Sequence, residues 1–262
     1  MIPGRQQDIV SRVSRRLAEF DRAKTFAMRN ARPIVSFTFD DIPDSALDNG
    51  ARALSRNGVH GVLRRRRHLR DGSVRLALRG RREPAQARRR NEIACHTFSH
   101  PDAQTLDRAA LEREFEANSA FFATLDPRVS LDNFAYPYGS VGLRQKRAVQ
   151  ERFLSCRSVR EGINAGRVDL GFLKAVRLYD SEIARDGIDA VVAETVQLNG
   201  WLIFYTHDVA NPPSKQGCSP ALLEMAVRSA KAAGCECLSV REALAAIGIA
   251  APAEPAPTAQ TT

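Results

Sequence analysis

Two pairs of residues in this chain have the types and the spacing of a hydrolytic metal site. Asp40 and Asp41 end one apolar stretch, and His96 and His100 follow another with three residues between them. Two neutral imidazoles and one carboxylate form a three-ligand set that leaves a coordination position open for water. The other carboxylate is then free to act as a base on that water. These four side chains are therefore the first candidates for an active site.

Each pair also has an ordinary structural explanation when it is taken alone. Adjacent acids often cap a following helix, and histidines four residues apart suit a pair on the surface of a helix. Their place among other polar residues favours a catalytic role over these structural ones. Both pairs lie at or just after the end of a predicted strand. The same is true of three further polar sites: Thr38, Pro137-Tyr138-Gly139 and His207-Asp208.

The elements that must position these residues alternate between strands and helices. Apolar stretches predict strands over 33–39, 91–95, 131–136, 154–157, 201–205 and 235–240. Amphipathic stretches predict helices over 45–57, 107–125, 144–153, 188–198 and 220–233. This alternation is typical of an α/β fold with a parallel sheet or barrel, in which sites lie at the ends of the strands.

Length and composition limit the class of protein. The chain has 262 residues, of which 44% are hydrophobic, so we expect one large domain with a substantial core. No apolar run approaches the roughly 18 residues that a membrane-spanning helix needs. Residues 1–30 carry charges throughout, and a periodic apolar set predicts an amphipathic helix instead of a secretory signal: Ile9, Val13, Leu17 and Phe20. We therefore expect a soluble, cytoplasmic protein.

The cysteines and the C-terminal tail favour roles outside the chemistry. Five cysteines are odd in number and lack paired metal-ligand spacing, so we expect buried, reduced thiols. A tail over 250–262, rich in Ala, Pro and Thr, is expected to be disordered. The expected organisation is thus a helix within 1–30, a domain over 31–249 and this tail.

Four motifs occur in a defined order along the chain: Thr38-Phe-Asp-Asp, His96-Thr-Phe-Ser-His, Phe134-Ala-Tyr-Pro-Tyr-Gly and Phe204-Tyr-Thr-His-Asp. This order resembles the polysaccharide deacetylase family of carbohydrate esterases, of the chitooligosaccharide deacetylase type. The resemblance covers roughly residues 33–248, apart from an Arg-rich interruption. It implies a distorted (β/α) barrel with about seven parallel strands and a divalent metal, usually Zn²⁺.

The resemblance also implies a role for each matching residue. Asp41, His96 and His100 would hold the metal, and Asp40 would be the general base that takes a proton from the attacking water. His207 would protonate the departing amine, which is too basic to leave unprotonated. The implied activity is removal of N-acetyl groups from an amino-sugar oligo- or polysaccharide, so the expected partner is an N-acetylated carbohydrate.

Further residues would contact the substrate. The backbone N–H of Tyr138, which follows Pro137, would stabilise the oxyanion formed at the acetyl carbonyl. Phe204 and Tyr205 would line the pocket for the acetyl methyl group, and Asp208 is a further candidate beside them.

Two departures from the family pattern affect the environment of the base. Many members have an arginine just before the Pro-Tyr-Gly motif that pairs with the base, whereas Ala135 and Tyr136 occupy that place here. The orienting charge must therefore come from elsewhere or be absent. The family's Asp-Trp motif is also missing, and Asp169 and Asp180 are the candidates for its aspartate.

The net charge of +9 arises from one segment of the chain. Residues 61–90 contain twelve arginines against Asp71 and Glu83, so the rest of the chain is close to neutral. The run could be a nucleic-acid patch or a solvated insertion, but it has no aromatic residue and little helical segregation of charge. The family expects its buried second strand here, which four consecutive arginines from Arg64 are not expected to supply. We do not expect a nucleic-acid partner.

A pair of compensating frameshifts is the hypothesis that we favour for this segment. Read in the shifted frame, the codons for 62–71 can encode Phe-Tyr-Val-Ala-Ala-Gly-Thr-Cys-Gly-Thr, which suits an apolar strand and a following loop. The normal frame would resume near Asn91. Sequencing the gene region tests this, since an uninterrupted frame with the same run in close relatives would contradict it. The alternatives to a sugar deacetylase are therefore a non-sugar amide hydrolase on the same scaffold and an inactive product of a frameshifted gene.

Overall fold

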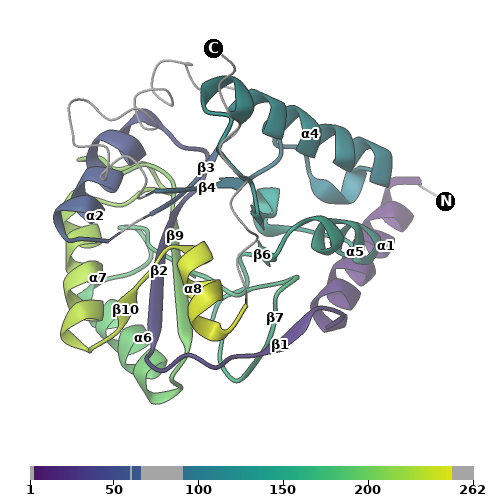
Figure 1. Ribbon diagram of the computed structural model, residues 1–262. Helices are drawn as coiled ribbons and strands as arrows, with labels where there is room; N and C mark the ends of the chain where they lie inside the picture. The colour runs from purple at the N-terminus through teal and green to yellow at the C-terminus, as the bar shows by residue number, and fades with distance from the viewer. Residues whose placement is uncertain (1–2, 60, 66–90, 250–262) are drawn as a thin grey trace, which may run out of the picture.

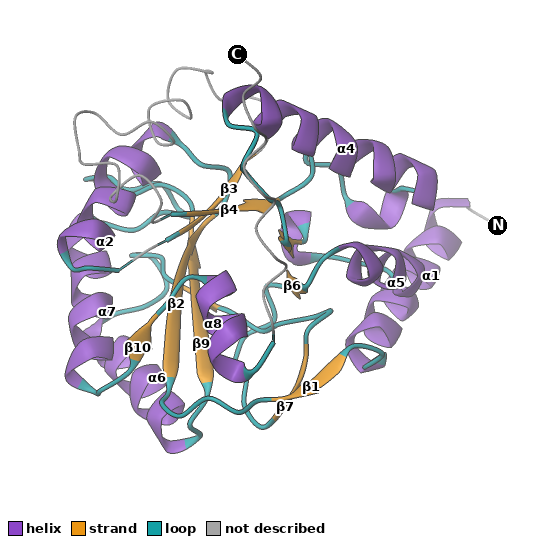
Figure 2. Cartoon of the chain, in the orientation of Figure 1, coloured by secondary structure: helices purple, strands orange, loops and turns teal. Residues whose placement is uncertain are grey.

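An eight-stranded sheet forms the centre of the protein (Figures 1 and 2). The structure, a computed structural model, describes residues 3–59, 61–65 and 91–249. The strands of this sheet are β2 (Ile34–Phe39), β3 (Val62–Arg65), β4 (Glu92–Cys95), β5 (Asn133–Ala135), β6 (Ser155–Arg157), β8 (Val176–Arg177), β9 (Trp201–Thr206) and β10 (Glu236–Cys237).

Seven of these strands form one continuous parallel path. The order is β6-β5-β4-β3-β2-β9-β8, and β10 pairs with β2 off this path. Every neighbouring pair on the path is parallel. Leu173 forms a parallel bridge with Arg157 of β6. Strand β8 begins three residues after Leu173 and pairs with β9. The segment before β8 therefore connects the two ends of the path, as the predicted distorted barrel of about seven strands requires.

Helices follow the strands and cover the outside of the sheet (Figure 1). They are α2 (Arg52–Arg56), which continues a π-helical segment Ala46–Ala51, α4 (Arg108–Leu125), α5 (Leu143–Arg152), α6 (Arg185–Gln197), α7 (Pro220–Ala232) and α8 (Val240–Ile247). Asp107 and Ser219 cap α4 and α7, because each side chain accepts a hydrogen bond from a backbone N–H of the first helical turn. These helices confirm the α/β alternation expected from the sequence.

Alternating residues of β9 belong to two different clusters of the core. Phe37 and Phe204 stack at 5.7 Å in the cluster that includes buried residues of α6 and α7. Trp201, Ile203 and Tyr205 belong to the other cluster, which includes apolar residues of α8. Successive side chains of a strand point to opposite faces, so both faces of β9 are buried.

The second strand of the path forms despite its arginines. β3 pairs with Thr38 and Phe39 of β2 and, over its whole length, with β4. Val62 at its start is fully buried. The expectation that the arginine run removes this strand is therefore wrong, because strand pairing uses backbone groups that every non-proline residue carries. The rest of the Arg-rich segment, and with it the question of the reading frame, lies outside the described residues.

The end of the described chain also differs from the sequence prediction. The strand expected over 235–240 is reduced to Glu236–Cys237, because Ser239 begins a helix. Ser239 and Glu242 form a capping box, in which each side chain accepts the other's backbone N–H, at 3.3 and 2.8 Å. Cys235 is a buried free thiol and Cys237 a half-buried one, in line with the structural role expected of them. The tail over 250–262 lies outside the described residues.

The N-terminal segment packs against the barrel as a separate helix and strand. The predicted helix is α1 (Pro3–Phe20), and β1 (Thr25–Ala27) pairs antiparallel with β7 (Arg167–Asp169). Among the described residues, none of the helices combines the length and the apolar character that crossing a bilayer requires.

A buried lysine connects α1, α5 and β7. The ammonium group of Lys146 is fully buried and lies 2.5 Å from the Asp169 carboxylate. It also donates to the backbone carbonyls of Ala18 and Asp21. One side chain thus fixes the C-terminal end of α1 to the domain.

Replacing Lys146 by Met is expected to lower the free energy of unfolding by about 3–5 kcal/mol, because the Asp169 carboxylate would stay buried without its cation. Urea denaturation measures this difference. The matched control is Lys174→Met at an exposed lysine, which should change stability by less than about 0.5 kcal/mol. Equal stability of the two variants would contradict the role given to Lys146.

Candidate functional site

The polar residues singled out in the sequence converge at the carboxyl ends of parallel strands. Asp40 follows β2, His96 follows β4 and His207 follows β9. The Asp40 N–H donates to the carbonyl of Thr206 at 2.8 Å, which joins the ends of β2 and β9. This end of a (β/α) barrel is where active sites are found.

Asp41, His96 and His100 form a group of suitable size for a metal ion. Their ligand atoms all lie within 4.8 Å of one another. The Asp41 Oδ1 atom is 3.9 Å from His96 Nε2 and 3.7 Å from His100 Nε2. Ligand atoms around tetrahedral zinc, at bonds of about 2.0 Å, are about 3.3 Å apart, so small side-chain shifts would bring these three into position. The donor set of two imidazoles and one carboxylate fits Zn²⁺ and similar divalent ions.

His96 is held in the tautomer and charge state that a metal ligand needs. Its Nδ1 lies 2.8 Å from the carbonyl of Ala135, so Nδ1 carries the proton and Nε2 presents its lone pair toward Asp41. Burial lowers the pKa of His96 to about 3, which keeps the imidazole neutral at pH 7.

The loop with the two histidines is shaped by α4 and is not helical. Thr97 and His100 have φ of 61° and 59°, in the left-handed region. The Glu114 carboxylate of α4 accepts the backbone N–H groups of Phe98 and Ser99 at 2.8 and 2.7 Å. The surface-helix explanation of the His pair therefore does not apply, because the chain turns sharply between the two rings.

A buried ion pair supplies the charge that the sequence departures left open. The guanidinium of Arg157, at the end of β6, donates to the Asp40 carboxylate. Asp40 and Arg157 are 3% and 1% exposed. The ring of Tyr205 lies 4.7 Å from the guanidinium carbon and covers it. Arg157 thus supplies beside Asp40 the charge that Ala135 and Tyr136 cannot supply, and sequence reasoning missed it.

The two aspartates considered for the missing Asp-Trp motif have other partners. Asp169 is the partner of Lys146 between α5 and β7. Asp180 accepts the backbone N–H of Ser219 at 2.7 Å, at the start of α7. Neither is the partner of Arg157, which forms an ion pair with Asp40.

The Pro137-Tyr138-Gly139 turn places Tyr138 beside the His pair. Pro137 is buried, and Tyr138 is 67% exposed with φ of 57°. Its ring lies 4.6 Å from the His100 ring, edge to face. Gly139 has φ of 64°, and a Cβ there would come within 2.1 Å of Val159, so only glycine fits this turn.

His207 lies at the exposed rim of the same strand ends. Its Nδ1 is 3.2 Å from the carbonyl of Gln216, and its ring packs 6.0 Å from the ring of Tyr179. Tyr179 in turn contacts Tyr205, whose ring covers Arg157. A continuous set of aromatic contacts therefore links His207 to the Asp40–Arg157 pair.

The further substrate residues expected from the sequence, Phe204, Tyr205 and Asp208, lie on or just after β9. Phe204 packs in the core against Phe37, on the opposite face of β9 from Tyr205. Adjacent strand residues face opposite sides, yet both side chains also border one small enclosed space beside β2, so their role in an acetyl pocket stays a prediction. Asp208 organises its own loop, since its carboxylate accepts the backbone N–H of Ser214 at 2.9 Å.

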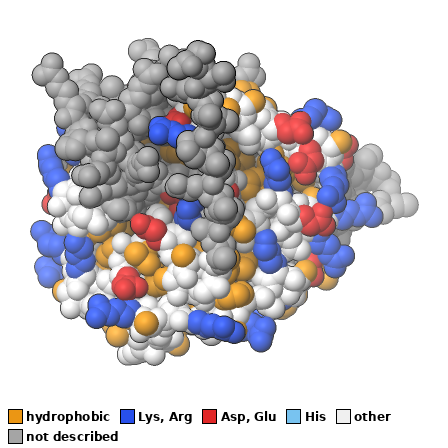
Figure 3. Space-filling view, viewed as in Figure 1, with side chains coloured by type: hydrophobic (Ala, Val, Ile, Leu, Met, Phe, Trp, Pro, Cys, Tyr) orange, Lys and Arg blue, Asp and Glu red, His pale blue; other side chains and the backbone are white. Residues whose placement is uncertain are grey.

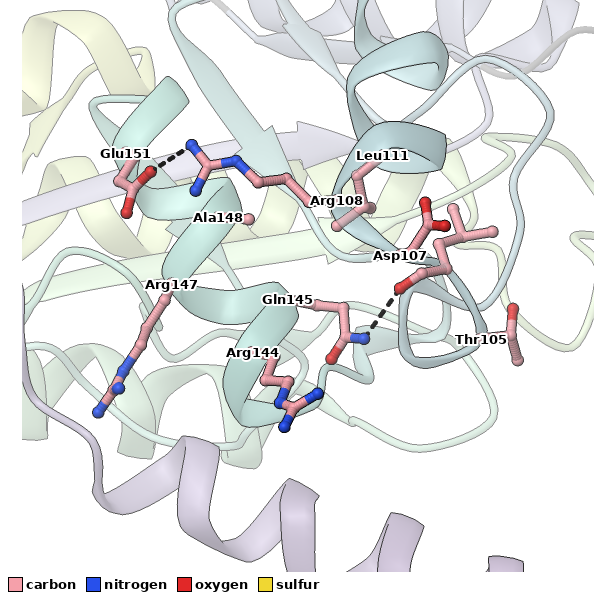
Figure 4. Close-up of a pocket in the computed structure, with 10 residues that line it drawn as sticks. Thr105, Asp107, Arg108, Leu111, Arg144, Gln145, Arg147, Ala148 and Glu151 are labelled. Atoms are coloured by element: carbon pink, nitrogen blue, oxygen red, sulfur yellow. Dashed lines mark hydrogen bonds and ion pairs between the residues drawn. The ribbon is translucent and has the colours of Figure 1, made fainter.

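A separate cavity lies between α4 and α5 (Figure 4). It measures about 490 Å³ and contains none of the strand-end residues described above. Arg108 and Glu151 form an ion pair across it at 2.7 Å, and Gln145 donates to the carbonyl of Leu106 at 2.9 Å. We place the candidate site at the strand ends, where the titratable groups converge.

Solved structures with this fold are distant in sequence. An acetyl xylan esterase of family 4 from Clostridium thermocellum is 18% identical with a TM-score of 0.60, and the match covers 83% of this chain and 93% of that one. The Bc1960 peptidoglycan N-acetylglucosamine deacetylase is 15% identical with a TM-score of 0.57, with 83% and 90% covered. BA3943, a CE4 family pseudoenzyme from Bacillus anthracis, is 13% identical with a TM-score of 0.55, with 82% and 66% covered. At these identities the likeness establishes the fold alone.

The family is indicated by sequence comparison as well. No curated protein sequence matches the chain at a significant level. The family model described as polysaccharide deacetylase matches residues 27–152, a range that includes the Asp pair, the His pair and the Pro-Tyr-Gly turn. Residues 27–152 are thus similar to the polysaccharide deacetylase family, and these solved structures share the fold of the chain.

Proposed function

We propose that this protein is a metal-dependent hydrolase that removes N-acetyl groups from an amino-sugar oligo- or polysaccharide. The observation that carries the proposal is the placement of a buried, Arg-paired carboxylate, Asp40, directly beside a group of three potential metal ligands. Asp41, His96 and His100 would hold a divalent ion, most simply Zn²⁺. Such an ion would acidify a water molecule and polarise the acetyl carbonyl. The related esterase from Clostridium thermocellum was solved with cobalt.

Asp40 is proposed as the general base. Its carboxylate accepts from Arg157, so it is held in one orientation, and the adjacent cation favours its ionised form. An ionised carboxylate can take the proton of the attacking water. Its neighbour Asp41 has φ of 62°, so the backbone reverses between the two residues and directs their carboxylates to different partners.

Tyr138 and His207 are proposed to act on the substrate side. Water attack turns the acetyl carbonyl into an oxyanion, which the Tyr138 N–H can stabilise. The amine then leaves with a proton, and His207 is the candidate donor. The carbonyl of Gln216 at Nδ1 orients its ring, so Nε2 is the nitrogen that faces the substrate.

The family's range of substrates leaves a second candidate function. One barrel can host many chemistries, so a non-sugar amide is the alternative substrate. A structural relative is described as a pseudoenzyme, so an inactive protein is a further alternative. Acetate release from chitin oligomers, peptidoglycan fragments and simple amides, measured on a frame-verified gene product, separates the three.

The purified protein is expected to bind one Zn²⁺ per chain at the three proposed ligands. Asp41→Ala, His96→Ala and His100→Ala should each weaken Zn²⁺ binding by more than about 100-fold, because each removes a direct ligand. Equilibrium dialysis followed by elemental analysis measures the stoichiometry and affinity. His207→Ala is the matched histidine control and should keep the ion. Wild-type affinity in the three ligand variants would contradict the site.

Asp40→Asn is expected to reduce acetate release from chitin oligomers by about 10²–10⁴-fold while Zn²⁺ content stays at one per chain, because the amide cannot accept the proton of water. Asp48→Asn, at an exposed acid of the following helix, is the control and should keep full activity. An active Asp40→Asn protein would refute the base assignment. Loss of Zn²⁺ in this variant would place Asp40 among the ligands instead.

A further inference from the structure

Three large apolar side chains of helix α1 are exposed. Val13 and Leu17 are each 50% exposed and Phe20 is 79% exposed. They are spaced at i, i+4 and i+7, so they form one stripe along the helix. An amphipathic helix of a globular domain ordinarily turns such a stripe to the core. Here the stripe faces outward.

The opposite face of α1 attaches the helix to the domain through small and polar groups. Ser14 accepts the backbone N–H of Leu143, the first residue of α5, at 3.1 Å. Ala18 is fully buried, and its carbonyl accepts from Lys146 at 2.7 Å. Figure 1 shows α1 beside α5 at the edge of the molecule. These contacts fix the rotation of the helix and keep the apolar stripe on the outside.

Basic side chains flank the exposed stripe. Arg12 and Arg16 of α1 are exposed and lie along one side of the stripe, whereas the exposed Arg15 lies on another side of the helix and Arg22 follows just after its end. Two acids at the end of this segment form ion pairs with the domain, Glu19 with Arg160 and Asp21 with Arg147. Figure 3 shows Lys and Arg side chains interspersed with Asp and Glu along this edge of the molecule. The outer surface of α1 is thus both apolar and positively charged.

We propose that this surface, formed by Val13, Leu17, Phe20 and the flanking arginines, binds the surface of an anionic lipid bilayer. A helix with an apolar stripe that includes Phe and Leu, flanked by Arg, is the form that lies in the interface of a bilayer. Insertion buries the three apolar side chains among acyl chains, and the arginines contact anionic headgroups. A second copy of the chain is a poorer occupant, because stacking two α1 stripes would bring their arginines together.

Co-sedimentation with vesicles tests this proposal on the whole protein. Vesicles of phosphatidylcholine alone are compared with vesicles that contain phosphatidylglycerol. The wild type should bind the anionic vesicles, with affinity that falls as salt is raised, and should not bind the neutral ones. Leu17→Glu should weaken binding by at least about tenfold. The change removes an apolar side chain that the bilayer would bury and adds a negative charge that anionic headgroups repel.

The matched control is Leu198→Glu, which alters a leucine of similar exposure, 48%, after α6. This variant should bind vesicles like the wild type, and both variants should keep the wild-type Tm and acetate release, because neither residue belongs to the proposed site. Absence of wild-type binding to anionic vesicles, or equal binding by Leu17→Glu, would overturn the proposal. Light scattering without lipid gives a second check. If the wild type is a dimer and Leu17→Glu is a monomer, the surface serves self-association, and this result would also overturn the membrane proposal.

Discussion

The ion pair between Asp40 and Arg157 depends on the curvature of the whole sheet. β2 and β6 are separated by three strands in the sheet order, so in a flat sheet their residues would be about 19 Å apart at the usual strand spacing. The two side chains nevertheless share a hydrogen bond inside the protein. Their contact requires the sheet to curl into a barrel. The barrel must also keep both charges together, because removing either side chain would leave the other charge buried without this ion pair.

The loops around this pair hold a strained backbone in place. Asp41, His100 and Tyr138 all have positive φ, at 62°, 59° and 57°. Such conformations cost about 1–2 kcal/mol each for residues other than glycine, and they persist where surrounding contacts over-determine them. Glu114 of α4 supplies such contacts to the His loop. Loop geometry at the strand ends is therefore set by side chains of the helices and strands beneath it, and this makes the three potential ligands converge.

Features that follow from a local sequence pattern could be predicted. Features that depend on which residues meet in three dimensions could not. The strand ends that carry Asp40, His96 and His207 were predictable, because each follows an apolar, strand-like stretch. Arg157 was not, since a single arginine in a short strand carries no signal until the barrel brings it opposite Asp40. The opposite facing of Phe204 and Tyr205 required only strand alternation and could have been predicted. Periodicity predicted α1, but the polar contacts that turn its apolar stripe outward involve residues more than a hundred positions away.

The most direct test asks whether Arg157 keeps Asp40, the proposed base, in its ionised form. It compares the pH dependence of kcat/KM for acetate release between the wild type and Arg157→Met. The acid limb of the Arg157→Met profile should move to higher pH, because ionised Asp40 loses its adjacent cation. Arg157→Lys should lie between the two, since it keeps the charge without the fork of donors. Zn²⁺ content should stay unchanged throughout. Superimposable profiles for the wild type and Arg157→Met would contradict the account.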